Sequence, residues 1–393
     1  MKSIVVIFTL LISITIAANS NFVWNQLPNN GGTIPAGAAG AAMVAMNNKL
    51  YIFGGVHECV QTVPGPNNTV VCSGNQFFND TFQYDLKSGI WTMLPVGVVR
   101  PQSRAFHHMV ADESNSIIYL YGGVEYSSID GNFFVPFGDF WKFIVASNVW
   151  ILISASNPPG LRVDQGFAIS GHTIYLGFGL AGFGGTPEQN AKNDLWAYDI
   201  PSGVWSVVVP NDPFNTTQPP VRYQAPLVVN EKKKTLLTCY GDVLPDNQRS
   251  LVDTWSFDLG SGIWTMLDNN SAIPLFTFVA ATKGDIFVIA TGEMRGGTQV
   301  RCIDPINGKG NNPVDINRVL DMSITGSTYR TVNPDLNILP TMQAAYTNYM
   351  GTLYVWGGFN FFCESNGVQG TADHRTITNF PTMVSALDLP SHL

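Results

Sequence analysis

The sequence predicts an all-β protein whose sheets form a closed ring, a six-bladed β-propeller, and three observations favour this fold. An apolar strand that ends in glycine recurs along the chain, as in residues 50–55 and 118–123. An aromatic strand follows it, in most copies ending in Asp, and a Trp comes shortly afterwards. Charged residues make up 12% of the chain. This is about half of the ~25% usual in globular proteins, so little polar helix surface is expected.

The repeat can be followed through six copies. Trp91, Trp150, Trp205 and Trp264 close the first four, and in three of these the Trp comes six residues after the Asp. The fifth copy lacks its Trp, and we expect its second strand over residues 286–292 and its third over residues 300–304. The sixth copy has strands near residues 353–358 and 386–388, with no Trp strand after them.

A strand without a partner lies near the start of the chain, over residues 22–27. Its Trp24 is followed three residues later by Leu27, the same spacing as Trp91 and Leu94. We expect this strand to complete the sixth blade and close the ring, because closure removes exposed sheet edges.

These glycine, aromatic-Asp and Trp positions together resemble the kelch family over essentially all of residues 19–393. The resemblance implies a propeller with four strands in each blade, and it implies no particular activity. We expect each Trp to pack as a large apolar plate against the adjacent blade. Glycines at the end of the second strand are expected where backbones crowd or φ becomes positive.

The first 18 residues read as a secretory signal peptide. A short basic start precedes an apolar run over residues 4–16, and small residues follow at Ala17 and Ala18. The alternative, a membrane anchor, is disfavoured because a span needs ~20 apolar residues. The prediction is therefore a secreted, extracellular protein, with a signal peptide over residues 1–18, a propeller over residues 19–393 and no membrane insertion. The formal net charge of −8 disfavours nucleic acid as a partner.

A secretory route permits glycans and disulfides. Four Asn-x-Ser/Thr sequons stand in turn-like stretches, at Asn67, Asn79, Asn215 and Asn269. Cys59 and Cys72 flank a loop in the first copy, and we expect a disulfide there; free thiols or other pairings are the alternatives. Cys239 lies in an apolar strand and is predicted to be a buried thiol, whereas the pairing of Cys302 and Cys363 stays open.

The resemblance to kelch proteins points to one face for ligand binding. This face is formed by the residues that follow the glycine pairs and those that precede each blade's first strand. The candidates in these positions are His57, Arg104, Glu125, Arg162, Arg222, Tyr223, Asp242, Glu293, Arg295, Gln343 and Asn360. The alternative for each is a solvent-facing loop residue with no role in binding, but loops on a rigid scaffold often carry function.

The main functional hypothesis is a non-catalytic binding protein that presents this face to a protein or glycan partner. The spacing of Cys and His gives no metal signature, and no cofactor motif is present. The alternative is a carbohydrate-active enzyme of the sialic-acid epimerase type. In that case the carboxylate of Glu293 and the guanidinium of Arg295 would perform general acid–base chemistry on a sugar.

Overall fold

The fold is seen in a computed structural model. It describes residues 23–64, 70–127, 133–182, 190–243, 251–269, 275–295, 311–313, 317–324, 326–332, 343–358, 360–363, 375–379 and 384–389. Within these ranges only the backbone is described for residues 58–64, 70–74, 126–127, 133, 293–295, 311–313, 317, 331–332, 360–363 and 375–379. The described residues include no helix long and apolar enough to cross a membrane.

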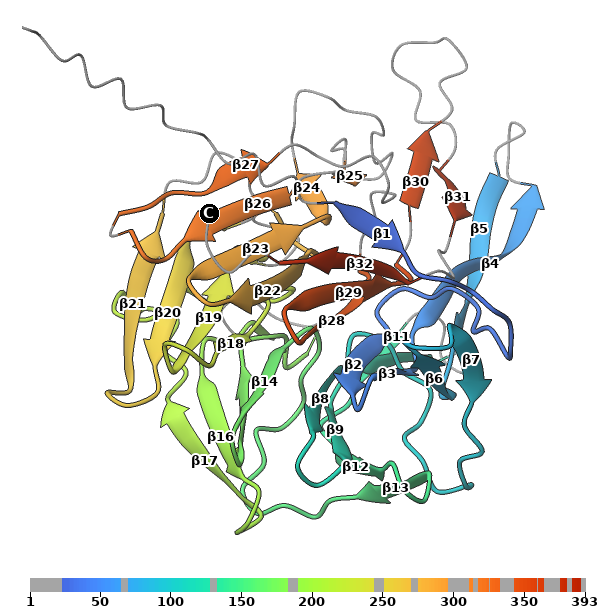
Figure 1. Ribbon diagram of the computed structural model, residues 1–393, viewed down its shortest axis with the longest axis horizontal. Helices are drawn as coiled ribbons and strands as arrows, with labels where there is room; N and C mark the ends of the chain where they lie inside the picture. The colour runs from blue at the N-terminus through green and yellow to red at the C-terminus, as the bar shows by residue number, and fades with distance from the viewer. Residues whose placement is uncertain are drawn as a thin grey trace, which may run out of the picture.

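Six antiparallel four-stranded sheets follow one another around a ring, which confirms the six-bladed propeller (Figure 1). Blade 1 contains β2 (Ala42–Met46), β3 (Lys49–Phe53), β6 (Thr81–Asp85) and β7 (Ile90–Met93). Blade 2 contains β8 (His108–Asp112), β9 (Ile117–Tyr121), β12 (Phe140–Ile144) and β13 (Val149–Leu152). Blade 3 contains β14 (Gly166–Ser170), β15 (Thr173–Gly177), β16 (Leu195–Asp199) and β17 (Val204–Val209).

The remaining three blades have the same order of strands from the centre outward. Blade 4 contains β18 (Val228–Asn230), β19 (Thr235–Cys239), β20 (Thr254–Asp258) and β21 (Ile263–Asp268). Blade 5 contains β22 (Val279–Lys283), β23 (Ile286–Ala290), β26 (Asn317–Asp321) and β27 (Arg330–Val332). Blade 6 contains β28 (Ala345–Tyr349), β29 (Thr352–Trp356), β32 (Ser385–Asp388) and β1 (Trp24–Gln26).

The ring is closed by the strand from the start of the chain, as the sequence predicts. β1 pairs with β32 in antiparallel register, with Trp24 opposite Leu387 and Gln26 opposite Ser385. Figure 1 shows the two strands side by side although one is blue and the other red. The outer edge of the last blade is therefore formed by residues far away in sequence, and opening the ring would expose the edge of β32.

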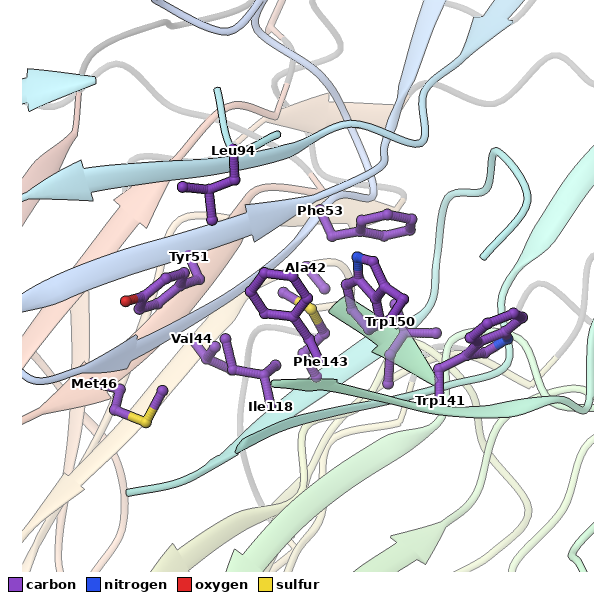
Figure 2. Packing of buried hydrophobic residues seen from close by; sticks show 12 residues of the cluster. Ala42, Val44, Met46, Tyr51, Phe53, Leu94, Ile118, Trp141, Phe143 and Trp150 are labelled. Atoms are coloured by element: carbon purple, nitrogen blue, oxygen red, sulfur yellow. The ribbon is translucent and has the colours of Figure 1, made fainter. Parts of the chain in front are cut away.

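Aromatic side chains fill the seams between blades, which confirms the expected role of the Trp residues. Trp150 of blade 2 is buried against Phe53 of blade 1 and against Phe143 of its own blade (Figure 2). The indole Nε1 of Trp150 donates a hydrogen bond to Thr81 Oγ1 of blade 1, at 3.1 Å. Each seam thus combines a large buried apolar area with specific geometry.

Two left-handed residues end the second strand of every blade. In blades 1, 2 and 6 an aromatic residue comes first and two glycines follow, as in Tyr121, Gly122 and Gly123. In blades 3 and 4 the aromatic residue has moved one place along, so Phe178 and Tyr240 themselves adopt φ values of 64° and 47°. Their rings still face the next blade, because Phe178 packs against Trp264 and Tyr240 against Tyr329.

The prediction for the third strand of blade 5 was wrong. The strand that pairs with β23 is β26 (Asn317–Asp321), with Ile286 opposite Asp321. Residues 300–304, the predicted third strand, all lie outside the described residues. Both segments end in an apolar residue followed by Asp, so the pattern alone could not separate them. Because neither segment has a Trp six residues after its Asp, the residue pattern does not determine which of them pairs with β23.

Tyr329 takes the place of the missing Trp in blade 5. The register of β26 and β27, in which Val319 lies opposite Arg330, sets the preceding Tyr329 beside Leu320. Tyr329 is buried, and its ring centroid lies 5.5 Å from that of Tyr240 in blade 4. Its hydroxyl accepts a hydrogen bond from Thr254 Oγ1 at 3.2 Å. The seam between blades 4 and 5 is therefore more polar than its counterparts.

Candidate binding face and channel mouth

The two faces of the ring are built differently. One face, here called the turn face, consists of short turns such as residues 47–48, 171–172 and 284–285 between first and second strands, and 86–89 and 259–262 between third and fourth strands. Three consecutive lysines, residues 232–234, stand in one such turn. Two of them, Lys232 and Lys233, form ion pairs with Asp285 of the next blade. The opposite face, here called the hairpin face, receives the connections between second and third strands and the entries to the first strands.

Within the described part of the chain, four of these connections extend into two-stranded hairpins that stand on the hairpin face. They are β4–β5 (Val56–Pro64 and Val70–Phe77), β10–β11 (Val124–Ser127 and Phe133–Pro136), β24–β25 (Glu293–Arg295 and Asn311–Pro313) and β30–β31 (Asn360–Cys363 and Arg375–Asn379). They belong to blades 1, 2, 5 and 6, which are consecutive around the closed ring. β5 contacts β10, and β25 contacts β30. The hairpins β4–β5 and β30–β31 project clearly from the ring in Figure 1.

One left-handed residue per blade surrounds the centre of this face, two to four residues before the start of the blade's first strand. The six φ values lie between 53° and 60°, and the residues are Gly40, Phe106, Asp164, Gln224, Thr277 and Gln343. The backbone N–H of five of them donates to the carbonyl of another ring member, as Phe106 does to Gly40 at 2.7 Å and Gln224 does to Asp164 at 3.2 Å. A belt of backbone hydrogen bonds thus links the blades where the central channel opens.

The channel itself is lined by small and apolar side chains of the inner strands. A cavity of about 500 Å³ runs along β2, β8, β14, β18 and β28, with alanines at residues 41, 42, 45, 111 and 168 among its walls. A smaller cavity of about 60 Å³ lies at the hairpin face and is lined by the six left-handed residues. Polar side chains also line the larger cavity, among them Glu113 and Glu231 in turns of the turn face.

Three of the predicted binding residues are buried arginines with structural partners. Arg222 donates to Asp253 Oδ2 at 2.8 Å, and the same oxygen accepts from Trp255 Nε1 at 2.7 Å. Arg104 makes a bidentate contact with Asp139, at 2.6 and 2.8 Å, and Trp141 also donates to Asp139. Arg162, Asp194 and Trp196 repeat the arrangement in blade 3. Burial would raise the pKa of Asp253, but the charge and hydrogen bonds of Arg222 outweigh it and hold that pKa below its ordinary value.

Tyr223, Asp242 and Glu125 also have partners within the protein. Tyr223 donates through its hydroxyl to Asp242 Oδ2 at 3.2 Å, and both side chains are buried. Glu125 is only partly buried and accepts a hydrogen bond from Ser103 Oγ. For Glu293, Arg295 and Asn360 only the backbone is described, in the hairpins β24–β25 and β30–β31. A catalytic role for Glu293 and Arg295, and a contact between a ligand and any of these candidates, remain predictions.

Two neighbouring histidines pack beside the channel mouth. His107 is fully buried and packs edge-on against Phe53, with ring centroids 5.5 Å apart. Burial, together with the nearby charge of Arg104, holds the pKa of His107 well below its ordinary value. Burial also lowers the pKa of His108, to about 4. Both imidazoles are therefore neutral at pH 7.

The cysteine and sequon predictions fall in different parts of the structure. Cys239 is a free thiol with no exposed surface, as predicted, and burial raises its pKa. Cys59 and Cys72 lie in the paired strands β4 and β5, but their side chains are outside the described residues, as are those of Cys302 and Cys363. Asn67 also lies outside them. Asn79 and Asn215 are partly exposed, and Asn269 is exposed. The disulfide and the glycans remain predictions.

The belt of left-handed residues could hardly be predicted from the sequence. Its members share no residue type, and Asp164, Gln224 and Thr277 lie in ordinary loop sequence. The one usable signal is spacing, since each buried Arg of blades 2, 3 and 4 stands two residues before a belt residue. That spacing predicts an entry to the inner strand, but it does not predict a positive φ.

The repeated four-stranded blades, closed ring and loop-bearing face define a β-propeller of the kind that commonly serves protein interaction. The model of the KLHDC2/KLHL20/DRC7 Kelch-repeats domain matches residues 10–179 and 57–292, and the chain belongs to this kelch-repeat family. A mouse relative, Kelch domain-containing protein 10 (Mus musculus), is 25% identical over 203 residues, which are 51% of this chain and 42% of the relative. The chain thus spans less than half the length of that relative.

More distant similarity extends to other proteins. Mei4-dependent protein 6 of Schizosaccharomyces pombe is 27% identical over 171 residues, which are 42% of this chain and 23% of that protein. Human host cell factor 1 (Homo sapiens) is 23% identical over 266 residues, 64% of this chain and 12% of that protein. A solved structure titled "Structure of YjhT" has a TM-score of 0.60 at 14% identity and covers 85% of this chain and 93% of its own. At that identity the likeness shows the fold alone.

Proposed function

We propose that the protein binds a partner protein through its hairpin face. The observation that carries this proposal is the grouping of four hairpins on consecutive blades, 5, 6, 1 and 2, while the turn face has short connections. Loops and hairpins on a rigid ring are the usual place for recognition residues. Membership of the kelch-repeat family supports a role in protein interaction, although the partner's identity does not follow from the family.

The hairpins offer apolar side chains for such a contact. Phe134 and Val135 of β11 are exposed, with 44% of the Val135 surface accessible. An exposed aromatic residue beside an aliphatic one on a fixed hairpin is a suitable anchor, because burying such side chains supplies most of the energy of a typical interface. Glu125, opposite Val135 in the β10–β11 register, adds a carboxylate beside this apolar pair.

A matched pair of variants tests the proposal. Val135→Asp places a charge on the hairpin face, and Val207→Asp places the same charge on the outer strand β17, where Val207 is 46% exposed. Proteins captured by the unmodified chain are identified, purified and bound again to each variant. We expect Val135→Asp to weaken binding at least roughly ten-fold and Val207→Asp to leave it unchanged. Equal binding by both variants would refute this contact surface.

We also propose that the protein is secreted and glycosylated. The support comes from the sequence of residues 1–18 and from the sequons, of which Asn215 is the best described. Its Oδ1 accepts hydrogen bonds from the backbone N–H and the hydroxyl of Thr217, both at 2.8 Å, in an exposed turn. Expression with the native start in a eukaryotic host should yield protein in the medium that begins near residue 19. Its mass should fall on glycosidase treatment and on Asn215→Gln substitution. Retention inside the cell with residues 1–18 intact would contradict secretion.

A glycan as the ligand is a narrower possibility within the same proposal, and catalysis on a sugar is its enzymatic alternative. Both are tested by incubating the purified protein with a panel of sugars and glycans. Turnover that disappears in Glu293→Gln would establish the enzyme and contradict a purely binding role. Binding without turnover would favour a glycan ligand. If neither binding nor turnover is observed, the protein partner is the remaining proposal.

A further inference from the structure

Four polar side chains from consecutive blades meet at the channel mouth. Asp164, Gln224, Thr277 and Gln343 are the belt residues of blades 3, 4, 5 and 6, and all four line the small cavity. The backbones of Gln224 and Asp164 are joined by one hydrogen bond, and those of Gln343 and Thr277 by another of 3.3 Å. The two remaining belt positions are apolar, with the Phe106 ring lying over Gly40. Four of the six belt positions are therefore polar and two are apolar.

Oxygen atoms without hydrogen-bond partners are grouped at three of these four polar positions. Gln224 Oε1, Gln343 Oε1 and Thr277 Oγ1 are all buried, and none of them has a hydrogen-bond partner within the described part of the chain. Thr277 is itself more than nine-tenths buried. Leaving a buried polar group without a partner costs ~1–3 kcal/mol, so three such oxygens at one place call for an explanation.

The carboxyl group of Asp164 has no compensating positive charge. No Lys or Arg lines this cavity among the described residues, and the lining histidines His107 and His108 are neutral. The carboxyl group does accept a hydrogen bond from the side chain of Gln224, which is a neutral group. Ordered water could satisfy the three neutral oxygens, but water cannot neutralise the partly buried carboxylate of Asp164.

The size of the cavity limits what could fill it. Its volume of about 60 Å³ is well below the ~300–1,000 Å³ of typical organic-ligand pockets. It accommodates an ion with a few water molecules, since a single water needs ~10–15 Å³ on the same scale.

We propose that the channel mouth binds a hard metal cation of the Ca²⁺ type through Asp164, Gln224, Thr277 and Gln343. One carboxylate, two amide oxygens and a hydroxyl are oxygen donors of the kind that Ca²⁺ accepts, with water completing its 6–8 ligands. Mg²⁺ demands a stricter octahedral geometry, which suits it less to neutral side-chain oxygens held by four separate blades. The described residues bring no three His, Cys, Asp or Glu side chains together, so the site differs from an ordinary acidic or histidine cluster.

The number of charged ligands sets the expected affinity. A site with a single carboxylate belongs with the weak calcium sites of extracellular modules, whose dissociation constants are ~10⁻⁴–10⁻³ M. The cation would neutralise Asp164 and join blades 3 to 6 where their backbones meet. It would therefore stabilise the ring, and the proposal does not depend on which partner the hairpin face binds.

The test is calorimetric titration of the chelator-treated full chain with CaCl₂ and, separately, with MgCl₂, together with thermal unfolding in each salt. We expect Ca²⁺ to bind, to raise the melting temperature and to exceed Mg²⁺ in both effects. Asp164→Asn should weaken Ca²⁺ binding at least roughly ten-fold because it removes the one charged ligand. In chelator it should remain as stable as the unmodified protein, because it also removes the uncompensated carboxylate.

Two further variants keep the test decisive. Thr277→Val retains the shape and the β-branch of Thr277 and removes only its hydroxyl, so it should fold and bind Ca²⁺ several-fold more weakly. Glu113→Gln removes a charge at the other end of the channel and should leave Ca²⁺ binding unchanged. No Ca²⁺ binding by the unmodified chain, or binding that survives Asp164→Asn, would overturn the proposal and leave water at the channel mouth.

Discussion

The indole of Trp150 lies edge-on against the ring of Phe53, with centroids 5.1 Å apart, across the seam between blades 2 and 1. Aromatic contacts also cross two other seams. The ring centroids of Trp205 and Tyr121 lie 5.7 Å apart, and those of Trp91 and Trp356 lie 6.1 Å apart. In each case the aromatic residue at the end of one blade's second strand receives the large ring of the following blade. The seams, rather than the individual blades, therefore carry much of the apolar burial that holds the ring together.

Replacing Trp150 by Ala should strongly destabilise the protein. The change removes a buried ring from the seam and also removes the hydrogen bond to Thr81. We expect a loss of about 3–5 kcal/mol in the free energy of unfolding, measured by urea denaturation. The control is Ile151→Ala on the exposed side of the same strand, which should change stability by less than about 0.5 kcal/mol. Similar losses in both variants would show that the seam is not the stabilising element.

Gly122 should not tolerate a side chain. It adopts a φ of 68°, and an added Cβ would lie 2.3 Å from the carbonyl oxygen of Arg162 in the next blade. We expect Gly122→Ala to cost about 3 kcal/mol or more, because backbone strain adds to a clash with rigid backbone. Gly171 has a similar φ of 57° in an open turn, so Gly171→Ala should cost only about 1 kcal/mol. Circular dichroism melts of the two variants compare strain alone with strain plus clash.

Arg222 should be more important to stability than an exposed Arg, because its removal leaves the Asp253 carboxylate buried without its cation. Arg222→Met is expected to lose about 3–5 kcal/mol, and adding Asp253→Asn should restore part of that loss. The double variant keeps a side chain of the same shape beside Trp255. If the two losses simply add, the ion pair is not the reason for the burial of Arg222.

The Arg222–Asp253 ion pair also predicts that the protein loses stability at low pH. The pKa of Asp253 in the folded protein lies below 3.8, the value expected when the chain is unfolded. Its contribution to stability is therefore fully present above pH 3.8 and is lost as the pH falls through the lower folded value. Asp253→Asn should accordingly flatten the loss of stability below pH 4, seen in urea titrations at pH 5 and pH 3. If Asp253→Asn loses as much stability between pH 5 and pH 3 as the unmodified protein, Asp253 is not the source of the loss.

His107 likewise predicts a contribution to stability that is lost as the pH falls, but in a higher pH range. The folded protein keeps this imidazole neutral, whereas the unfolded chain takes up a proton as the pH falls below 6.5. Stability should therefore fall between pH 7 and pH 5, by about 2 kcal/mol for a His whose folded pKa lies below that range. His107→Phe retains a ring against Phe53 and should remove that part of the slope. Two groups shape the slope that remains in this variant. His108, whose pKa is about 4, lowers stability as the pH falls, whereas burial raises the pKa of Asp164 to about 7 and this carboxyl group opposes that fall.

The sequence was a good guide to the blades because their signals are local. Glycine after an apolar strand indicates a turn, and Trp six residues after Asp indicates a large buried side chain. Both features lie where they are predicted in blades 1, 3 and 4. Closure by the strand of Trp24 could be predicted because the sixth copy has no Trp strand. Blade 5 could not be placed in register, because Tyr329 stands in for its Trp after a longer turn.

The binding face was harder to predict residue by residue. Arg104, Arg162 and Arg222 stand at the loop positions expected of ligand contacts, yet each is folded back onto an Asp before its own blade's third strand. Sequence position gives the face on which a residue lies, but it does not give the direction of its side chain. The belt formed by Asp164 and its counterparts depends on φ values that residue type does not reveal.

The central claim, that the hairpin face is the surface bound by a partner protein, is tested most directly by hydrogen–deuterium exchange of the chain alone and in complex with its captured partner. We predict slower exchange on binding in β10–β11 and β4–β5, with turns such as residues 86–89 and 259–262 unchanged. Protection confined to those turns, or to the outer strands β13 and β17, would contradict the claim.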